Sequence, residues 1–192
     1  RSRAGDSVKL ADLLDEAVER AAAAIAEKNP DIGPEERLVV ANMVGIGALK
    51  YADLSTERIK DYVFDWDRML AFEGNTGPYL QYAHARICSI FRRAGIERAS
   101  VRSAHIILDQ PQERTLAMRL LAYPSAIDTT LDSYSPHKLC TYVYELASDF
   151  SSFYQECPIL KSDEPVRTSR LALADLTARV LEHSLGLLGI TA

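Results

Sequence analysis

The sequence predicts an all-α protein, a helical bundle, and three of its features support that fold class. Apolar residues recur at steps of three and four along most of the chain, which is the period of an amphipathic helix. The 9 glycines and 8 prolines sit mainly at the joints between these periodic segments. Because 47% of the 192 residues are hydrophobic, the chain can bury the core of one sizeable domain, or of one domain with part of another.

The first two predicted helices are separated by proline signals. Residues 8–28 carry one apolar face and end before an Asn-Pro pair. A second helix begins at Pro34, because proline at a first helical position presets the backbone, and it continues through "EERLVVANMVGIGALKYADL". Gly45 and Gly47 in this helix each lower its propensity by roughly 1 kcal/mol. We therefore expect this pair to mark close packing against another backbone rather than a ligand site.

The stretch "YVFDWDRML", residues 62–70, breaks the helical pattern. Its aromatic residues alternate with other types, and a period of two favours an extended segment. This stretch is the candidate boundary between two helical units. Asp65 and Asp67 would point to one side of such a segment without histidine or glutamate companions nearby, so we do not expect acid–base or metal chemistry there.

The second half of the chain predicts further helices joined by irregular segments. No repeat of 20–50 residues and no low-complexity tract occurs, which argues against a solenoid. "DQPQERT" leads into one helix, and "CPILKSDEPVR" reads as a loop. The expected helices cover residues 79–94, 113–122, 125–134, 136–153 and 166–188.

Composition excludes several classes of protein. The net charge of −5 and the pI near 5.4 give no overall electrostatic footprint for nucleic acid, although residues 86–102 hold five arginines against one acid. Three widely spaced cysteines form no CxxC pair, which suggests a reducing compartment. Four scattered histidines predict no metal site. We expect no membrane-spanning segment, and the first residues, "RSRAGDSVKL", look like part of something larger.

The helix over residues 79–94 carries two faces. Its apolar residues are sufficient to bury one side. A second stripe, a third of a turn away, consists of Tyr82, Arg86, Ser89 and Arg93. A tyrosine one turn before an arginine can stack on an unpaired base and contact phosphate. The alternative is a tyrosine half-buried at a helix seam and shielded by the arginine, and spacing alone favours that alternative.

A family resemblance changes this balance. "RSRAGDSVKLADLLDEAVERA", "VGIGALKYADLS", "YVFDWDRMLAFEGNTGPYLQYAHAR" and "FYQECPIL" together resemble the C-terminal part of a bacterial-type arginyl-tRNA synthetase, a class I enzyme. The resemblance covers essentially the whole chain, and the block "FDWDRMLAFEGNTGPYLQYAHAR" is highly specific. Residues Arg1 to Arg3 lie at or beside the family's second signature loop, which is often degenerate, and we assign them no catalytic role.

The resemblance implies a division of labour along the chain. Residues 1–72 look like the helices that link the catalytic core to the anticodon domain, and residues 73–192 look like the all-helical anticodon-binding domain. By position, Tyr82, Arg86 and Tyr154 match residues that the family places against the anticodon loop. Arg93 joins them as a candidate anticodon-binding residue of the same stripe.

Function follows from the same resemblance. The chain would be the tRNA-binding portion of an arginine-tRNA ligase, with arginine tRNA and the enzyme's own N-terminal catalytic domain as partners. We find no HIGH-like motif, GxGxxG, GxxxxGK[ST] or GxSxG, so we expect no catalytic residue, no metal site and no cofactor in this chain. ATP and Mg are expected for the full-length enzyme. The resemblance also implies a monomeric protein that lies in the cytoplasm and does not bind a membrane.

Two other classes stay open at this point. A helical protein-interaction module would explain the amphipathic stripes without RNA, but not the aromatic and arginine-bearing helix beside the "GNTGP" turn. A free-standing enzyme would need a nucleophile–base pair or a metal set, and the sequence offers neither. Asn75, Gln81 and His84 belong to the same block; Asn75 can simply close the turn, and the other two can orient neighbouring segments through hydrogen bonds.

Overall fold

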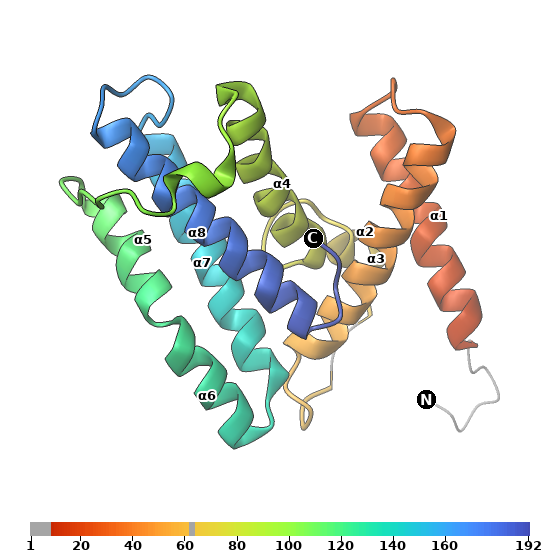
Figure 1. The fold of residues 1–192 in the computed structure, drawn as a ribbon. Helices are drawn as coiled ribbons and strands as arrows, with labels where there is room; N and C mark the ends of the chain where they lie inside the picture. The colour runs from red at the N-terminus through yellow and green to blue at the C-terminus, as the bar shows by residue number, and fades with distance from the viewer. Residues whose placement is uncertain (1–8, 62–63) are drawn as a thin grey trace.

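The computed structural model describes residues 9–61 and 64–192, and throughout these residues every regular element is a helix (Figure 1). The all-α fold class is therefore confirmed. The elements in chain order are α1 (Leu10–Lys28), α2 (Pro34–Ser55), α3 (Trp66–Met69), α4 (Gly77–Ala94), η2 (Arg98–Val101, a 3₁₀ turn), α5 (Pro111–Leu121), α6 (Tyr123–Ser133), α7 (Pro136–Glu156) and α8 (Val166–Leu187).

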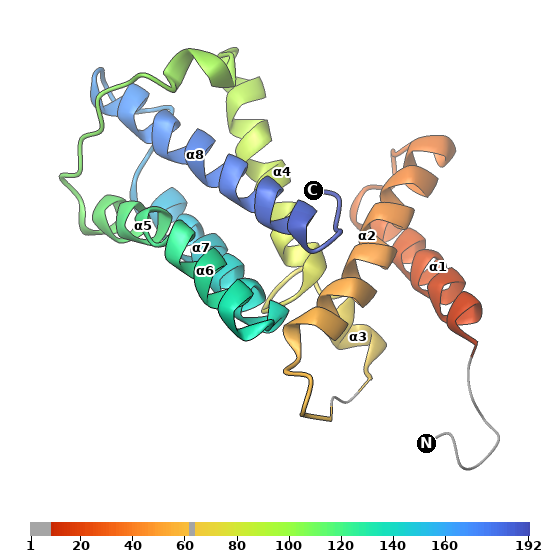
Figure 2. The same cartoon turned by 60° about the horizontal axis from the view of Figure 1, so that its bottom comes forward.

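The chain packs as a hairpin beside a bundle. α1 and α2 pack antiparallel around a small core of Ala21, Ile25, Ala41 and Val44. α4, α5, α7 and α8 enclose a much larger core, and α6 packs on α7 (Figure 2). α2 also contacts α4 and α7, so it connects the hairpin to the bundle. The apolar faces predicted for residues 79–94, 136–153 and 166–188 are the buried faces of α4, α7 and α8.

The glycine pair in α2 marks close packing, as predicted. A Cβ atom at Gly45 would lie 2.6 Å from the carbonyl oxygen of Ala17 in α1. A Cβ at Gly47 would lie 3.0 Å from Nε2 of Gln81, a side chain of α4. At Gly77, a Cβ would come within 2.9 Å of the Gly47 carbonyl oxygen. Glycines therefore let α2 approach α1 on one side and the start of α4 on the other.

The prediction of an extended segment over residues 62–70 is wrong from Trp66 onward. Tyr62 and Val63 lie outside the described residues, and Asp65 has the extended backbone angles φ −144° and ψ 112°. The Asp65 carboxylate, however, accepts a hydrogen bond from the Arg68 backbone N–H at 3.1 Å, and this cap starts α3. Phe64 and Trp66 make an edge-to-face contact at 4.8 Å between ring centroids.

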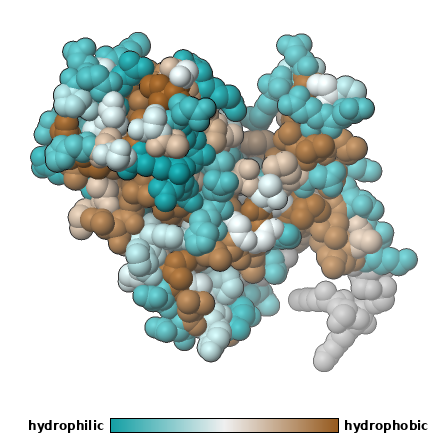
Figure 3. Space-filling model, in the orientation of Figure 1, coloured by the Kyte–Doolittle hydropathy of each residue, from teal (hydrophilic) through white to brown (hydrophobic). Residues whose placement is uncertain are grey.

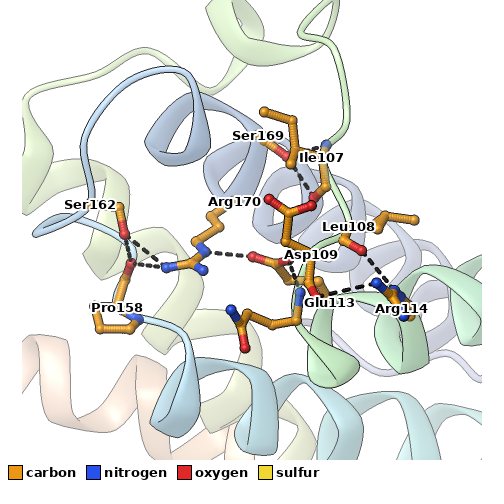
Figure 4. Close-up of polar contacts among 10 residues, drawn as sticks. Ile107, Leu108, Asp109, Glu113, Arg114, Pro158, Ser162, Ser169 and Arg170 are labelled. Atoms are coloured by element: carbon orange, nitrogen blue, oxygen red, sulfur yellow. Dashed lines mark hydrogen bonds and ion pairs between the residues drawn. The ribbon is translucent and has the colours of Figure 1, made fainter.

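A polar network holds the irregular segments against α5 and α8 (Figure 4). The buried Arg170 of α8 donates to Glu113 at 2.7 Å and to the Pro158 carbonyl at 2.8 Å. Glu113 in turn accepts the backbone N–H of Gln110 at 2.8 Å, which completes the cap of α5. Because these carboxylate and guanidinium groups satisfy each other, they can be buried at the joint of three segments.

The composition of α2 bears on the expectation that the chain has no membrane-spanning segment. By length and composition alone, this helix is long and apolar enough to cross a membrane. Core helices of soluble proteins and signal sequences pass the same test, so it is weak evidence. In this structure α2 is partly buried against α1, α4 and α7.

Candidate nucleic-acid interface

The second stripe of α4 presents an aromatic ring and a guanidinium to solvent. Tyr82 is 48% exposed, and Arg86 is half-buried one turn later. The guanidinium carbon Cζ of Arg86 lies 4.7 Å from the centroid of the Tyr82 ring, a cation–π distance. The apolar face of α4 is buried in the bundle core, which fixes these two side chains on its outer side.

Tyr154 joins this pair from α7. The Arg86 Cζ lies 5.9 Å from the centroid of the Tyr154 ring, so the guanidinium stands near both tyrosines. Tyr154 itself stacks on the buried Phe150 at 6.2 Å between centroids. Three of the predicted site residues, separated by up to 72 positions, thus form one tyrosine–arginine cluster (Tyr82, Arg86 and Tyr154).

The cluster rests on a well-fixed pair of helices. The ring centroids of Tyr79 in α4 and Tyr144 in α7 lie 5.9 Å apart, and the Tyr79 hydroxyl oxygen is 3.3 Å from the Ser151 Oγ. At its start, α4 is capped by Thr76, whose Oγ1 accepts the backbone N–H of Tyr79 at 3.2 Å. These contacts favour one relative position of α4 and α7. Tyr82 and Tyr154 are therefore kept at a constant spacing.

Arg93 lies outside the tyrosine–arginine cluster. It is exposed on α4, seven residues beyond Arg86, which corresponds to a rise of about 10 Å. Its guanidinium is therefore available to an extended polyanion along α4, but not to the same base as Tyr82.

Two arginines of the basic stretch serve the fold. Asp175 of α8 is 1% exposed, and its carboxylate accepts the Nε–H groups of Arg98 at 2.8 Å and Arg102 at 3.3 Å. These contacts attach η2 to α8. The local excess of positive charge that the sequence suggested over residues 86–102 is therefore partly neutralised by an acid more than 70 positions away.

The remaining polar residues of the block have structural contacts. The Asn75 Oδ1 lies 2.6 Å from the hydroxyl of the buried Tyr51 and accepts its hydrogen. The Gln81 side-chain amide donates to the carbonyls of Met43 at 3.1 Å and Thr191 at 2.7 Å, which ties α4 to α2 and to the C-terminal segment. The Gln81 contacts agree with the orienting role expected for that residue. The expectation that Asn75 closes the turn is not met, because Thr76 caps α4 and Asn75 bonds Tyr51 of α2 instead.

His84 is almost completely buried between α4 and α8. Its Nε2 lies 3.7 Å from the Cys88 Sγ and 3.9 Å from a Glu182 carboxylate oxygen. Burial lowers the pKa of His84, and the nearby Arg98 adds to this, while Glu182 opposes it. His84 thus sits in the packed interior and not at the exposed tyrosine–arginine cluster.

The three cysteines are free thiols. Burial raises the pKa of Cys140 to about 12 and also raises that of Cys157, so neither is a reactive thiolate. Over residues 9–61 and 64–192, no three His, Cys, Asp or Glu side chains come together in a group that could hold a metal ion.

Sequence reasoning missed two residues beside the tyrosine–arginine cluster. Lys28 at the end of α1 places its Nζ 5.0 Å from the centroid of the Phe72 ring, and both line a groove with Tyr82. Ile25 and Asn29 complete the lining. Lys28 and Phe72 are 44 positions apart in segments of different type, so no periodicity in the sequence links them.

Family models match two adjacent parts of the chain. Residues 80–192 match the DALR anticodon binding domain, and residues 1–66 match the catalytic domain of class I tRNA synthetases (R). The chain therefore belongs to the DALR anticodon-binding domain family. Within that family it corresponds to the C-terminal region of a bacterial-type arginyl-tRNA synthetase.

Individual relatives agree with this assignment. The chain is 53% identical to an arginine–tRNA ligase of Mannheimia succiniciproducens over 99% of its own length, and 52% identical to one of Enterobacter sp.. It covers 33% of each, so it spans about a third of the length of these curated relatives.

Two solved structures have the same fold. Thermus thermophilus arginyl-tRNA synthetase superposes with a TM-score of 0.89 at 36% identity, over 98% of this chain and 32% of that one. Plasmodium falciparum arginyl-tRNA synthetase gives a TM-score of 0.86 at 31% identity, over 96% and 33% of the two chains.

Proposed function

We propose that this chain is the tRNA-binding part of an arginine-tRNA ligase and that it holds the anticodon loop of arginine tRNA, so that the whole enzyme can attach arginine using ATP. The observation that supports this most directly is the tyrosine–arginine cluster on one face of a DALR-type helical bundle, in which Tyr82 is exposed and Arg86 and Tyr154 are half-buried. Unpaired bases of an RNA loop stack on tyrosine rings and on guanidinium planes. Each stacked base contributes about 1–3 kcal/mol of binding free energy.

The proposed mechanism in this part of the enzyme is binding, not bond chemistry. Tyr82 and Tyr154 stack on unstacked anticodon bases, and Arg86 between them pairs with a base edge or a phosphate. Arg93 neutralises a phosphate farther along the loop. A wrong base leaves a desolvated polar group unpaired, which supplies the discrimination. ATP and Mg belong to the whole enzyme, and we assign no residue of this chain to either.

The cellular setting belongs to the same proposal. The ligase acts as a monomer in the cytoplasm, with the catalytic domain in the same polypeptide and without a membrane. The helical protein-interaction module is not carried forward, because the matches to anticodon-binding proteins favour RNA over a protein ligand.

The test is binding of a labelled anticodon stem-loop of arginine tRNA, measured by fluorescence anisotropy. Arg86→Ala should weaken binding about tenfold or more, because it removes a stacking plane and a charge. Arg114→Gln is the matched control: it lies on α5, on the other side of the bundle from α4 (Figure 1), where its side chain bonds the Leu108 and Asp109 carbonyls. Equal affinity for a stem-loop with an exchanged anticodon would contradict the proposal.

A further inference from the structure

The groove between α1 and α4 is bordered by two aromatic rings, each paired with a cation. On one side Arg86 stands over Tyr82 at 4.7 Å, and on the other Lys28 stands over Phe72 at 5.0 Å. Tyr82, Phe72 and Lys28 all line this groove. The space-filling view shows the molecule hollowed between the α1–α2 hairpin and the bundle, on the side where α4 faces the hairpin (Figure 3). The two aromatic–cation pairs thus meet across one depression.

We propose that this groove is a second nucleotide subsite, in which one unpaired RNA base enters between Phe72 and Tyr82 while Lys28 contacts its phosphate. The inference rests on the proposed function, because it needs the same RNA loop at the tyrosine–arginine cluster. It goes further in one respect: Lys28 and Phe72 lie outside residues 80–192, which match the anticodon-binding domain. The α1–α2 hairpin then takes part in holding the loop.

The chemistry of the lining fits a nucleotide. Tyr82 borders both the tyrosine–arginine cluster and the groove, so a strand that stacks at the cluster can continue into the groove without a break. Aromatic rings accept any base through its π-face, and a lysine supplies a mobile point charge for a phosphate. The Asn29 side chain, exposed in the same lining, offers donors and an acceptor for a base edge.

The position of Phe72 explains why it can act as a platform. Its ring packs against the small core of the hairpin, and this packing limits its motion. The Lys28 stem at the end of α1 is exposed, so its ammonium group can move from the ring to an entering phosphate. One ring is thus fixed by the hairpin and the other by α4.

Stem-loop binding by substituted chains tests the subsite. Phe72→Leu keeps apolar volume against the hairpin core but removes the π-face, and it should weaken binding about tenfold. Phe72→Tyr keeps an aromatic ring at this position and should therefore retain most of the affinity. Lys28→Gln should weaken binding and reduce the slope of log K against log salt concentration by about 0.7, the value for one phosphate of a single strand. Lys9→Gln, at the opposite end of α1, is the matched control and should bind as the unsubstituted chain does.

A second measurement keeps the inference falsifiable if Phe72→Leu also lowers the melting temperature. Stem-loops with an abasic site at each loop position are bound to the unsubstituted chain and to Phe72→Leu. At one position the abasic RNA should remove the difference between the two proteins, which identifies the base in the groove. If no position does so, or if Phe72→Leu and Lys28→Gln bind normally while Arg86→Ala does not, the subsite is refuted and the proposed function stands. If the unsubstituted chain binds no stem-loop, the proposed function itself fails.

Discussion

Arg170 and Glu113 form a buried ion pair, and each charge is stabilised by the other and by the neighbouring hydrogen-bonding groups. Their side chains are 9% and 1% exposed, and their Nε and Oε1 atoms lie 2.7 Å apart. A buried ion pair adds little net stability, but removal of one partner leaves an uncompensated charge in the interior. The joint of α5, α8 and the loop after α7 therefore depends on both residues.

Arg170→Met should lower the free energy of unfolding by about 3–5 kcal/mol, because Glu113 keeps its desolvation cost without its partner. The double variant Glu113→Leu/Arg170→Met should lose much less than the sum of the single changes. Urea denaturation gives both values. Lys60→Met, which breaks an exposed pair with Glu57, is the control and should leave stability almost unchanged. Additive losses in the double variant would show that the pair is not coupled.

His84 predicts a pH dependence of stability. Burial holds its pKa below the unfolded value of about 6.5, so the unfolded chain binds more protons than the native one in that range. Stability should therefore fall as the pH drops through about 6.5 toward the lower native pKa. His84→Gln should reduce this fall, measured as the difference in urea midpoints between about pH 8 and pH 5.5. An identical fall in the variant would assign the effect to other groups.

At the scale of elements, the packing of α2 is decided by glycines as much as by apolar side chains. The Ala17 carbonyl oxygen of α1 lies only 2.6 Å from the position of a Cβ at Gly45. The sequence shows only that two glycines interrupt a helical pattern; the partner helix and its distance come from the fold. Close approach explains why α1 is held although its first apolar residue, Leu10, is 70% exposed.

Gly45→Ala should destabilise the chain by about 1–3 kcal/mol, because backbone atoms of α1 must move to admit the methyl group. Gly186→Ala in α8 is the matched control. Apart from the chain neighbours and the backbone of α8 itself, no atom lies within 4 Å of a Cβ at that position, so better helix propensity should raise stability by about 0.4–1 kcal/mol. Thermal unfolding of the two variants should shift in opposite directions. A stabilised Gly45→Ala would mean that α1 and α2 adapt without cost.

Sequence periodicity predicted most elements, and it failed where a local cap overrode it. The alternation of aromatic residues over residues 62–70 favours an extended segment, yet the Asp65 carboxylate caps the Arg68 N–H and turns the chain into α3. Tertiary contacts act with this cap, because Met69 is buried and the Trp66 ring centroid lies 5.2 Å from the Arg20 guanidinium carbon of α1, and neither contact can be read from the alternation.

At the scale of the whole molecule, RNA affinity must come from local charge. The chain carries −5 overall, and Arg98 and Arg102 are already paired with Asp175. The cations left beside the candidate interface are few, so the affinity should depend only shallowly on ionic strength. The proposed division at residues 72 and 73 stays a prediction, since the two family matches leave residues 67–79 between them.

Salt titration of stem-loop binding should give a slope of log K against log salt concentration near −2, about 0.7 for each of three cations, Lys28, Arg86 and Arg93. Arg93→Gln should reduce the slope by about 0.7. Arg102→Gln should reduce it less, because the Arg102 guanidinium is paired with the Asp175 carboxylate, which it shares with Arg98. An equal effect of both substitutions would mean that phosphate contacts spread over the whole basic stretch.

The sequence by itself determined the fold class, the order of most helices, the family and the stripe of α4 that carries Tyr82, Arg86 and Arg93. These follow from local periodicity and from a long specific block, both of which are properties of neighbouring residues. Tertiary structure alone decided which distant side chains meet: Tyr154 beside Arg86, Asp175 beside two arginines, and Phe72 with Lys28 beside Tyr82. The physical reason is that helix packing, not sequence spacing, sets the distance between side chains on different elements.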